Sequence, residues 1–517
     1  MSQPEEKRLS TEAAADIKVV AKGGAIQLVG QITERLLSFF FQAVFVRILG
    51  PAPYGLYKQV QQLLMNSSQL GLAGFNYAGM RFITKARAEG NHAAVTGTMR
   101  VALSASGIAS LLVFAALMVF ASALAEPFGE SSAQDAELTR LIRLGAAFVP
   151  LFAILQVLRY CTQAYKTMAP SVIAGNIVRP VTRFGLGVAV LLAGFEVAGA
   201  VVTFTISAAV AALVAAWYLR RMLTKDERAA TPHAEAGPIV RFALPQAGAS
   251  LLGIQTLGLG ILILGALSTD RAVGLFAVAL SLQGLGNVFL GGIVNIWAPV
   301  VSDLHSRGEI ARLGSLYKTI NRWIATFSLP FLAVLMLEPD VLLLFFGDKA
   351  RGAESIIVLL AIGNVFYTGT GPTGYLISMT GHPGLNFVNS AISVAAYIGL
   401  GLWIVPEHGA VGMAAVDLGV TAFINILRVV EAKMLVGLQP FGKNFFKPVV
   451  ATLAGAGVLL ASRLVTENTL AEVAAIAMAA LAYIAVLKVL GLDEEEQLVW
   501  KRIRRRAFKR GGNEKAE

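Results

Sequence analysis

The chain has 517 residues, of which 56% are hydrophobic and only 15% are charged. A soluble protein of this composition would expose large apolar patches, so the composition indicates an integral membrane protein. The single cysteine, Cys161, excludes an internal disulfide. The net charge of +11 does not by itself indicate nucleic acid, because basic residues also gather on one side of membrane proteins. The long polar N-terminus lacks a small-residue cleavage site, so no signal peptide is expected.

Two long apolar segments between Gly23 and Thr84, joined at Gly50-Pro51, are predicted to form the first pair of membrane-spanning helices. The first segment exceeds the roughly 20 residues that a span requires, yet it carries Glu34 and Arg35 near its middle. A charge facing lipid at that depth costs roughly 2.5–3.5 kcal/mol, so both should face protein or water. Spacings of three and four place five polar residues on one helix face, namely Gln27, Gln31, Glu34, Ser38 and Gln42. This pattern predicts a water-filled cavity inside a helical bundle.

Fourteen apolar segments are candidate membrane spans. In chain order they are 23–49, 54–78, 98–125, 139–163, 170–194, 197–221, 239–267, 271–298, 318–337, 354–379, 384–404, 409–434, 446–464 and 470–490. Lysine and arginine concentrate in the even-numbered loops, whereas the odd-numbered loops are mostly acidic. The positive-inside rule therefore predicts that both termini are cytoplasmic.

Short motifs recur in the same order in two parts of the chain. Tyr54-Gly55-Leu56-Tyr57 resembles Val273-Gly274-Leu275-Phe276, and Asn176 in the fifth span matches Asn389 in the eleventh. Six spans separate the copies, so both insert in the same orientation. The sequence therefore predicts an all-α integral membrane protein with about 14 transmembrane helices. Twelve of them form two six-helix lobes related by a pseudo-two-fold axis along the membrane normal, and two extra helices follow at the C-terminal end.

This prediction divides the chain into six parts. They are a cytoplasmic N-terminal segment (1–22), an N-lobe (23–222), a cytoplasmic linker (223–238), a C-lobe (239–436), two further helices (437–491) and a basic amphipathic cytoplasmic tail (492–517). The tail interleaves Trp500 and Phe508 with lysine and arginine, which predicts contact with anionic phospholipid. Each basic residue gains about 1 kcal/mol at such a surface. A solvated tail is the alternative.

The opening of the chain resembles a known family. Lys22-Gly23-Gly24, the run Phe45 to Pro51, Tyr54 to Tyr57 and Arg81-Phe82-Ile83 are similar to Wzx-type polysaccharide and oligosaccharide flippases. These belong to the multidrug/oligosaccharidyl-lipid/polysaccharide exporter superfamily, and the layout of 14 spans extends the resemblance over the whole chain. The resemblance implies a V-shaped pair of lobes that carries an undecaprenyl-pyrophosphate-linked oligosaccharide from the inner to the outer leaflet. It further implies no enzyme activity, a place in the bacterial cytoplasmic (inner) membrane, and polysaccharide polymerase and chain-length machinery as partners.

Several cationic side chains are candidates for binding the pyrophosphate, because a guanidinium group matches phosphate oxygens. The predicted substrate-binding set of the cavity is Arg35, Arg179, Arg183, Arg47, Lys58, Glu34 and Gln31. Other roles are open for most of them. Arg47 and Lys58 can extend to the outer headgroups, Arg179 and Arg183 can be structural partners of Glu34 or Asp417, and Glu34 can be neutralised by Arg35.

Two acids are candidates for coupling transport to H⁺ or Na⁺, namely Asp417 in the twelfth span and Glu34. A helix-capping or hydrogen-bonding role is equally open for Asp417. No cofactor and no metal site are expected, because the five histidines are scattered without ligand spacing. No nucleic-acid partner is expected either.

Three functions compete on these observations. The first is a flippase for a lipid-linked saccharide precursor. The second is a cation-coupled exporter of small molecules or drugs with the same fold, which would favour an acidic cavity. The third is a membrane-embedded glycosyltransferase or polymerase, which would need a larger outer loop than the roughly 15 residues expected here. The cationic residues of the predicted cavity favour the flippase.

Overall fold

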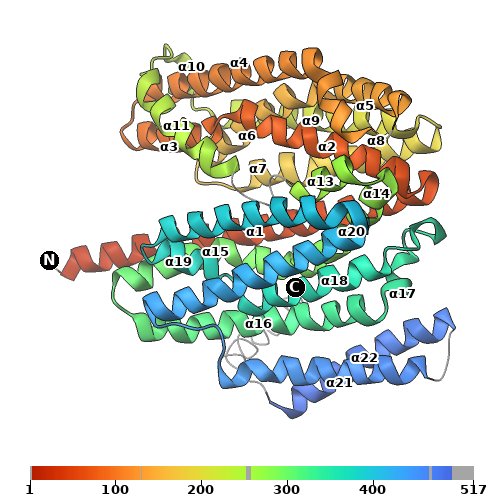
Figure 1. Ribbon diagram of the computed structural model, residues 1–517. Coiled ribbons are helices and arrows are strands. Elements are labelled where there is room, and N and C mark those ends of the chain that lie inside the picture. The colour runs from red at the N-terminus through yellow and green to blue at the C-terminus, as the bar shows by residue number, and fades with distance from the viewer. Residues whose placement is uncertain (1–2, 130, 252–257, 465–467, 492–517) are drawn as a thin grey trace, which may run out of the picture.

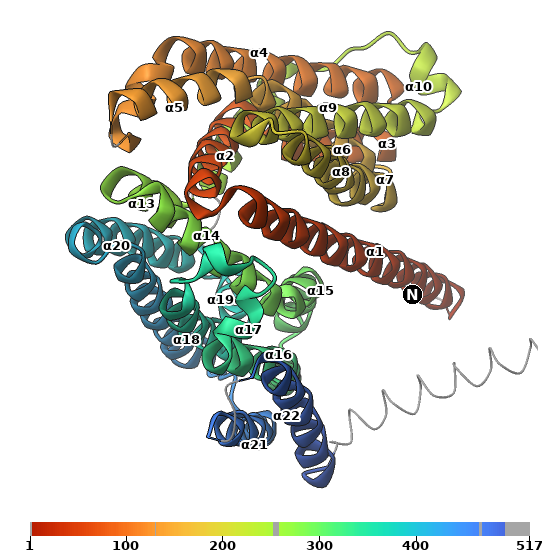
Figure 2. The ribbon, with the colours of Figure 1, turned by 90° about the vertical axis from the view of Figure 1, so that its right-hand side faces the viewer.

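The computed structural model describes residues 3–129, 131–251, 258–464 and 468–491. Within these residues every regular element is a helix. Figure 1 shows two helical bundles, and Figure 2 shows that the long first helix lies between them. The predicted all-α architecture with two lobes is confirmed. The predicted basic tail (492–517) lies outside the described residues.

In chain order, most helices of the N-lobe precede those of the C-lobe. The first part of the chain forms α1 (Gln3–Leu49), α2 (Pro51–Leu72), α3 (Phe75–Ala88), α4 (His92–Ala125), η1 (Glu126–Phe128), α5 (Ser132–Gly145), α6 (Phe148–Gln163), α7 (Ala169–Val172), η2 (Ile173–Val178), α8 (Arg179–Leu192), α9 (Glu196–Met222) and α10 (Lys225–Ala229). The second part forms α11 (Ala236–Leu251), α13 (Leu259–Leu267), α14 (Asp270–Gly286), α15 (Val288–Ser306), α16 (Ile310–Leu337), α17 (Pro339–Leu343), η3 (Asp348–Ala350), α18 (Glu354–Thr370), α19 (Thr373–Met379) and α20 (Pro383–Val436). Beyond the lobes lie η4 (Lys443–Phe445), α21 (Phe446–Arg463) and α22 (Thr469–Val489).

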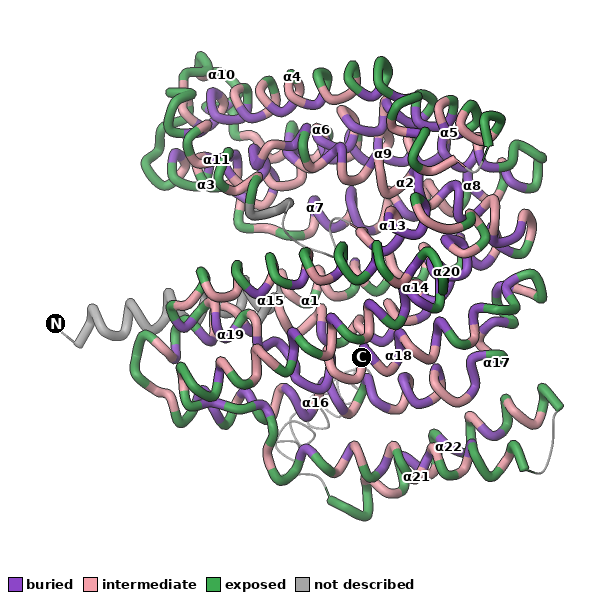
Figure 3. The backbone as a smooth tube through the Cα atoms, in the orientation of Figure 1, coloured by how far each residue is buried: buried purple, intermediate pink, exposed green. Residues whose placement is uncertain are grey.

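Length and hydropathy mark the protein as a multi-pass membrane protein. Eight helical stretches of the described residues are long and apolar enough to cross a membrane, some of them made of two successive helices such as α5 and α6, and the bent pair α14 and α15 makes a ninth candidate. Large apolar side chains are exposed, for example Leu112 and Val119 of α4, each 67% exposed. Figure 3 shows that exposed residues recur along α4. Exposed apolar residues in such density fit a surface that contacts lipid rather than water.

Several helices bend or break where the predicted spans are continuous. The predicted span 239–267 forms α11 and α13, and Gly258 before α13 has a φ of 55°. Most of helix α11 belongs to the predicted C-lobe (239–436), but the helix packs on α3 of the N-lobe, where the Phe242 ring lies edge-on against Phe82 and under the Arg81 guanidinium. The predicted loop between spans eleven and twelve is instead a sharp kink within α20 at Gly409. Glycine allows this kink because its φ of 51° is unfavourable for other residues.

The two lobes meet at the end of the molecule where α1 turns into α2, called here the hairpin end. Gly55 of α2 packs on the main chain of Asp270 at the start of α14, and Gly274 of α14 packs on Pro51 at the start of α2. A Cβ atom on either glycine would overlap a carbonyl oxygen. Gly55 and Gly274 are equivalent positions of the sequence repeat, and so are Pro51 and Asp270. The contact is therefore reciprocal, as a two-fold relation between the lobes requires.

Polar contacts between the lobes reinforce this closed end. The Asp270 carboxylate accepts hydrogen bonds from the side-chain amides of Gln59 and Gln134, the latter at 2.6 Å. Arg47 donates to the Leu344 carbonyl at 2.9 Å, and Lys349 donates to the Ile48 carbonyl at 2.8 Å. Charged donors paired with main-chain acceptors hold the turn of the first hairpin against the C-lobe.

A buried carboxylate attaches the linker between the lobes to the N-lobe. The Glu227 side chain is 2% exposed and accepts hydrogen bonds from Arg87 Nε, the Tyr165 hydroxyl and the Thr224 N–H. Burial raises the pKa of Glu227, but the hydrogen bonds from Thr224, Tyr165 and Arg87 outweigh it, and the net pKa is lowered. The charged form therefore stabilises the attachment above the ordinary carboxyl pKa. This stabilisation is lost as the pH falls through the lowered pKa.

Removing the charge in Glu227→Gln is expected to loosen the linker at neutral pH. Hydrogen bonds to a charged group contribute about 1.5–3 kcal/mol, so local opening should increase roughly tenfold or more. The measurement is the rate of tryptic cleavage after Lys225 and Arg228. Glu89→Gln is the matched control, because Glu89 pairs with Lys85 at the surface and is 56% exposed. Equal cleavage rates in the two variants would contradict the role given to Glu227.

Candidate functional site

The polar face of α1 lines a cavity of about 480 Å³ between the two lobes. The wall from α1 consists of Gln31, Glu34, Arg35, Ser38, Phe39 and Gln42. The facing wall comes from α14 and α15, and Asn176 of the π-helical segment η2 completes the site. Residues of both lobes therefore line the cavity. The polar side chains of α1 face this cavity rather than lipid.

A local distortion places Asn176 and Arg179 beside α1. Residues Ile173–Val178 form a π-helix, in which the Arg179 N–H donates to the Ala174 carbonyl five residues earlier. Pro180 follows and has no N–H to offer the Asn176 carbonyl, which explains why a regular α-helical turn is lost here. Short π-helical segments within α-helices are frequent at functional sites.

Glu34 is neutralised by partners from this segment. Its carboxylate forms an ion pair with Arg179 and accepts a hydrogen bond from the Asn176 side-chain amide. The side chains of Arg179 and Glu34 are 19% and 26% exposed, and Glu34 is the member of the pair that lines the cavity. The structure thus brings Glu34 together with Arg179 rather than with its neighbour Arg35.

Arg159 extends this network, and the sequence analysis missed it. Its guanidinium donates to Asn176 Oδ1 at 2.8 Å, to Gln156 Oε1 at 2.9 Å and to the Ser171 carbonyl at 3.0 Å. Gly175 allows this close approach, since a Cβ there would overlap the guanidinium. Polar residues at 156, 159 and 163 share one face of the fourth span. That spacing is the signal that could have identified Arg159.

Arg35 is the cation of the cavity that has no acidic partner. Its Nη1 donates to the Gly284 carbonyl of α14. Arg35 forms no ion pair with any residue that the structure describes. Gln31 lies nearby, close to Gly291 on the facing wall. A carbonyl satisfies only one of the five N–H donors of an arginine, so Arg35 can still donate to a bound anion.

The remaining candidates lie outside the lining of this cavity. Arg183 donates to the Tyr57 hydroxyl at 2.7 Å and packs over the Phe41 and Phe204 rings, inside the N-lobe. Lys58 donates to Gln61 at 3.0 Å, and Arg47 is at the hairpin end as described above. Asp417 accepts a hydrogen bond from the Tyr397 hydroxyl at 2.8 Å within α20. Of the predicted set, Gln31, Glu34 and Arg35 therefore line the cavity, and Arg179 is connected to it through its ion pair with Glu34.

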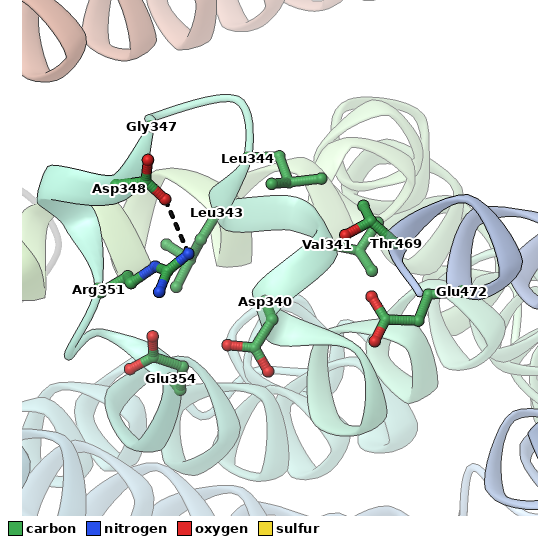
Figure 4. Close-up of a pocket in the computed structure, with 10 residues that line it drawn as sticks. All are labelled: Asp340, Val341, Leu343, Leu344, Gly347, Asp348, Arg351, Glu354, Thr469 and Glu472. Atoms are coloured by element: carbon green, nitrogen blue, oxygen red, sulfur yellow. Dashed lines mark ion pairs between the residues drawn. The ribbon is translucent and has the colours of Figure 1, made fainter. Parts of the chain in front are cut away.

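A second pocket of about 300 Å³ lies at the hairpin end of the C-lobe and is acidic, as Figure 4 shows. Asp340, Glu354 and Glu472 line it, and Asp348 forms an ion pair with Arg351 at 2.8 Å. Among the described residues, no group of three or more His, Cys, Asp or Glu is arranged to hold a metal ion. This pocket is separate from the cavity beside α1.

Comparison with protein families identifies the chain. The family model described as "Polysaccharide biosynthesis protein" matches residues 20–305, which is more than half of the chain. The chain belongs to the polysaccharide biosynthesis protein family. The matched region contains the cavity-lining part of α1, the π-helical segment and α14, so it includes both walls of the cavity.

Solved structures show which fold this polysaccharide biosynthesis protein shares. The lipid II flippase MurJ in an inward closed conformation matches with a TM-score of 0.71 and 12% identity, over 90% of this chain and 98% of that chain. An inward-facing multidrug resistance MATE family transporter of the MOP superfamily matches with a TM-score of 0.65 and 16% identity, over 80% and 98%. A MOP superfamily transporter from Pyrococcus furiosus matches with a TM-score of 0.56 and 17% identity, over 82% and 96%. No curated protein matches the chain. At these low sequence identities, the similarity shows a shared fold and nothing about activity.

Proposed function

We propose that this protein is a flippase that moves a lipid-linked saccharide precursor across the membrane by alternating access. The proposed cargo is an undecaprenyl-pyrophosphate-linked oligosaccharide or polysaccharide precursor, carried from the inner to the outer leaflet. Membership of the polysaccharide biosynthesis family and the fold shared with a lipid II flippase support a role of this class. The protein would act as a transporter rather than as an enzyme.

The observation that carries the proposal is the charge of the cavity. Its lining acid, Glu34, is already paired with Arg179, whereas Arg35 faces the cavity without an acidic partner among the described residues. The lining therefore favours an anion, and a pyrophosphate is an anion that arginine binds well. Holding the charged group in this cavity keeps it away from lipid while the isoprenoid chain stays in the membrane.

A cation-coupled exporter of small molecules or drugs is the second candidate, because the fold is also that of MATE transporters. A cationic drug would need an available carboxylate, and Glu34 is engaged by Arg179 and Asn176. Asp417 is the proposed site for a coupling proton or sodium ion. It is a carboxylate within a membrane-spanning helix, and Tyr397 is its described hydrogen-bond donor.

The proposed membrane is the bacterial cytoplasmic membrane, with both termini in the cytoplasm. The alternation of basic and acidic loops supports this orientation. The hairpin end would then lie on the periplasmic side, and the structure would represent a state closed to the periplasm. Anionic phospholipid at the tail, the polysaccharide polymerase and the chain-length machinery remain the proposed partners.

Depletion of the protein in its native host tests this function. The expected result is that lipid-linked saccharide accumulates in the membrane and remains inaccessible to a glycan-labelling reagent applied to spheroplasts. Re-expression of the wild-type chain should lower the accumulated lipid-linked saccharide to its normal amount. A depleted strain with normal amounts of surface-exposed polysaccharide and no accumulated lipid-linked saccharide would contradict the proposal.

A further inference from the structure

One arginine inside the C-lobe has neither a hydrogen bond nor an ion pair with any residue that the structure describes. This residue is Arg428 of α20, and its Nε atom is buried. Its guanidinium lies against Gly374 of α19, where a Cβ atom would stand 3.5 Å from both Cζ and Nε. A buried donor without a partner costs about 1–3 kcal/mol, and the guanidinium has further N–H donors that can bind a ligand.

The acid nearest to Arg428 in sequence is held by another group. Glu431, one turn further along α20, accepts a hydrogen bond from the Asn389 side-chain amide at 2.6 Å. Asn389 is 1% exposed and is the repeat equivalent of Asn176, which binds Glu34 in the N-lobe. Each lobe thus has an asparagine that orients a carboxylate. In the N-lobe that carboxylate also pairs with an arginine, whereas in the C-lobe the arginine is left without an ion pair among the described residues.

Tyrosine rings connect Arg428 to the cavity beside α1. Tyr367 of α18 lies within electrostatic range of both Arg35 and Arg428, and Tyr375 of α19 lies within range of Arg428 and of Tyr77 in the N-lobe. Tyr375 is 47% exposed. Figure 1 places α3 and α19 toward the end of the molecule from which α1 starts, away from the hairpin end. Pairwise proximity therefore links Arg35 of the cavity to Tyr367, Tyr367 to Arg428, and Arg428 to Tyr375 of α19, and this succession is called here the row.

The chemistry of this row suits sugar residues. Aromatic rings offer flat apolar surfaces with a polar end, which match the C–H face and the hydroxyls of a pyranose. A guanidinium offers several donors, and hydroxyl oxygens accept them. Asn386 Oδ1, buried and without a hydrogen-bond partner, lies beside the same glycine and can accept from a hydroxyl. A pyrophosphate held at Arg35 would not extend along the row, but the saccharide attached to it would.

We propose that Tyr367, Tyr375 and Arg428 form a saccharide subsite in the C-lobe, which binds the sugar residues next to the pyrophosphate of the cargo. This inference rests on the proposed flippase function and assigns the sugar to a place distinct from Arg35. Sugar rings stack on the tyrosines, and Arg428 donates hydrogen bonds to their hydroxyls. In the proposed orientation the subsite opens toward the cytoplasm, where the saccharide would have to enter.

Two lipid probes separate the subsite from the pyrophosphate site. The first is the lipid-linked saccharide extracted from the depleted host, and the second is undecaprenyl pyrophosphate, which has no sugar. Binding of each is measured to the purified full chain in lipid nanodiscs. The wild-type chain should bind the saccharide-bearing lipid roughly tenfold more tightly, since a hydrogen bond to a charged group contributes about that factor.

Arg428→Gln and Tyr375→Ala are each expected to abolish this preference for the sugar, and Tyr375→Phe should retain it because the ring is kept. Arg35→Gln should instead weaken binding of both lipids. Lys433→Gln is the matched control, since Lys433 is an exposed cation at the end of the same helix.

If Arg428→Gln weakened the binding of both lipids equally, Arg428 would belong to the pyrophosphate site and the proposed subsite would be overturned. An absence of sugar preference in the wild-type chain would also overturn it, and binding of neither lipid would remove the flippase function itself.

Discussion

Adding one methyl group at Gly55 or Gly274 is expected to prevent the hairpin end from closing. Each Cβ would overlap a main-chain carbonyl oxygen of the opposite lobe, and a main chain in a helix cannot move aside as a flexible side chain can. Overpacking of a close contact costs about 1–3 kcal/mol, which shifts a two-state equilibrium roughly 5- to 150-fold. Alanine stabilises a helix by up to about 1 kcal/mol relative to glycine. Transport should therefore fall although each substitution stabilises the helix that carries it.

Labelling of a cysteine in the cavity measures this change of state. Ser281→Cys places a thiol on the cavity wall, and the native Cys161 is fully buried, so it contributes little background. A membrane-impermeant maleimide applied from the periplasmic side should label Ser281→Cys faster in Gly55→Ala or Gly274→Ala than in the parent. Gly399→Ala is the control, because a Cβ there has open space within 4 Å. Unchanged labelling and normal transport in both test variants would exclude this contact from the transport cycle.

Replacing Arg35 is expected to impair transport far more than it lowers the amount of protein. Arg35 has no acidic partner among the described residues, so Arg35→Gln leaves no buried carboxylate unpaired. Loss of a charge-assisted hydrogen bond to the cargo should reduce transport roughly 10- to 100-fold. Arg35→Lys should restore part of the activity, since it keeps the charge and loses the planar fork. The measurements are transport rate and protein abundance in the same membranes.

Arg179 should behave in the opposite way, because it neutralises Glu34. Arg179→Ala leaves that carboxylate with Asn176 as its described partner, and breaking this partly buried pair costs less than the roughly 3–5 kcal/mol of a fully buried pair. Protein abundance should fall first, and the double variant Glu34→Gln, Arg179→Gln should recover it. If Arg179→Ala kept normal abundance while Arg35→Gln did not, the roles assigned to the two arginines would be reversed.

The polar wall of the cavity could be predicted because a single helix carries it. Spacings of three and four on the first span place Gln31, Glu34, Ser38 and Gln42 on one face, and the structure turns that face toward the C-lobe. The contact between Gly55 and Gly274 could be anticipated only in part. The repeat indicates that the positions are equivalent, but no local pattern states that the two copies touch.

The partners of the arginines could not be predicted from spacing. Arg179 and Arg183 are one turn apart and share a helix face, yet one reaches Glu34 and the other enters a cluster of aromatic rings. A long side chain can lean in more than one direction from the same face, and its partners come from segments distant in sequence. Arg428 was missed for the same reason, since Tyr367 and Gly374 approach it only in the folded chain.

The most direct test of the flippase function is transport by the purified full chain in liposomes. Undecaprenyl-pyrophosphate-linked saccharide, extracted from the depleted host and fluorescently labelled on the sugar, would be incorporated in both leaflets. A membrane-impermeant reagent that destroys the label would then report how quickly the inner pool reaches the outer leaflet. The account predicts that wild-type protein exposes nearly all of the label and that Arg35→Gln slows exposure roughly 10- to 100-fold. The flippase function would be contradicted if half of the label stayed protected in liposomes with wild-type protein, as it does in empty liposomes, while the same liposomes exported a cationic dye.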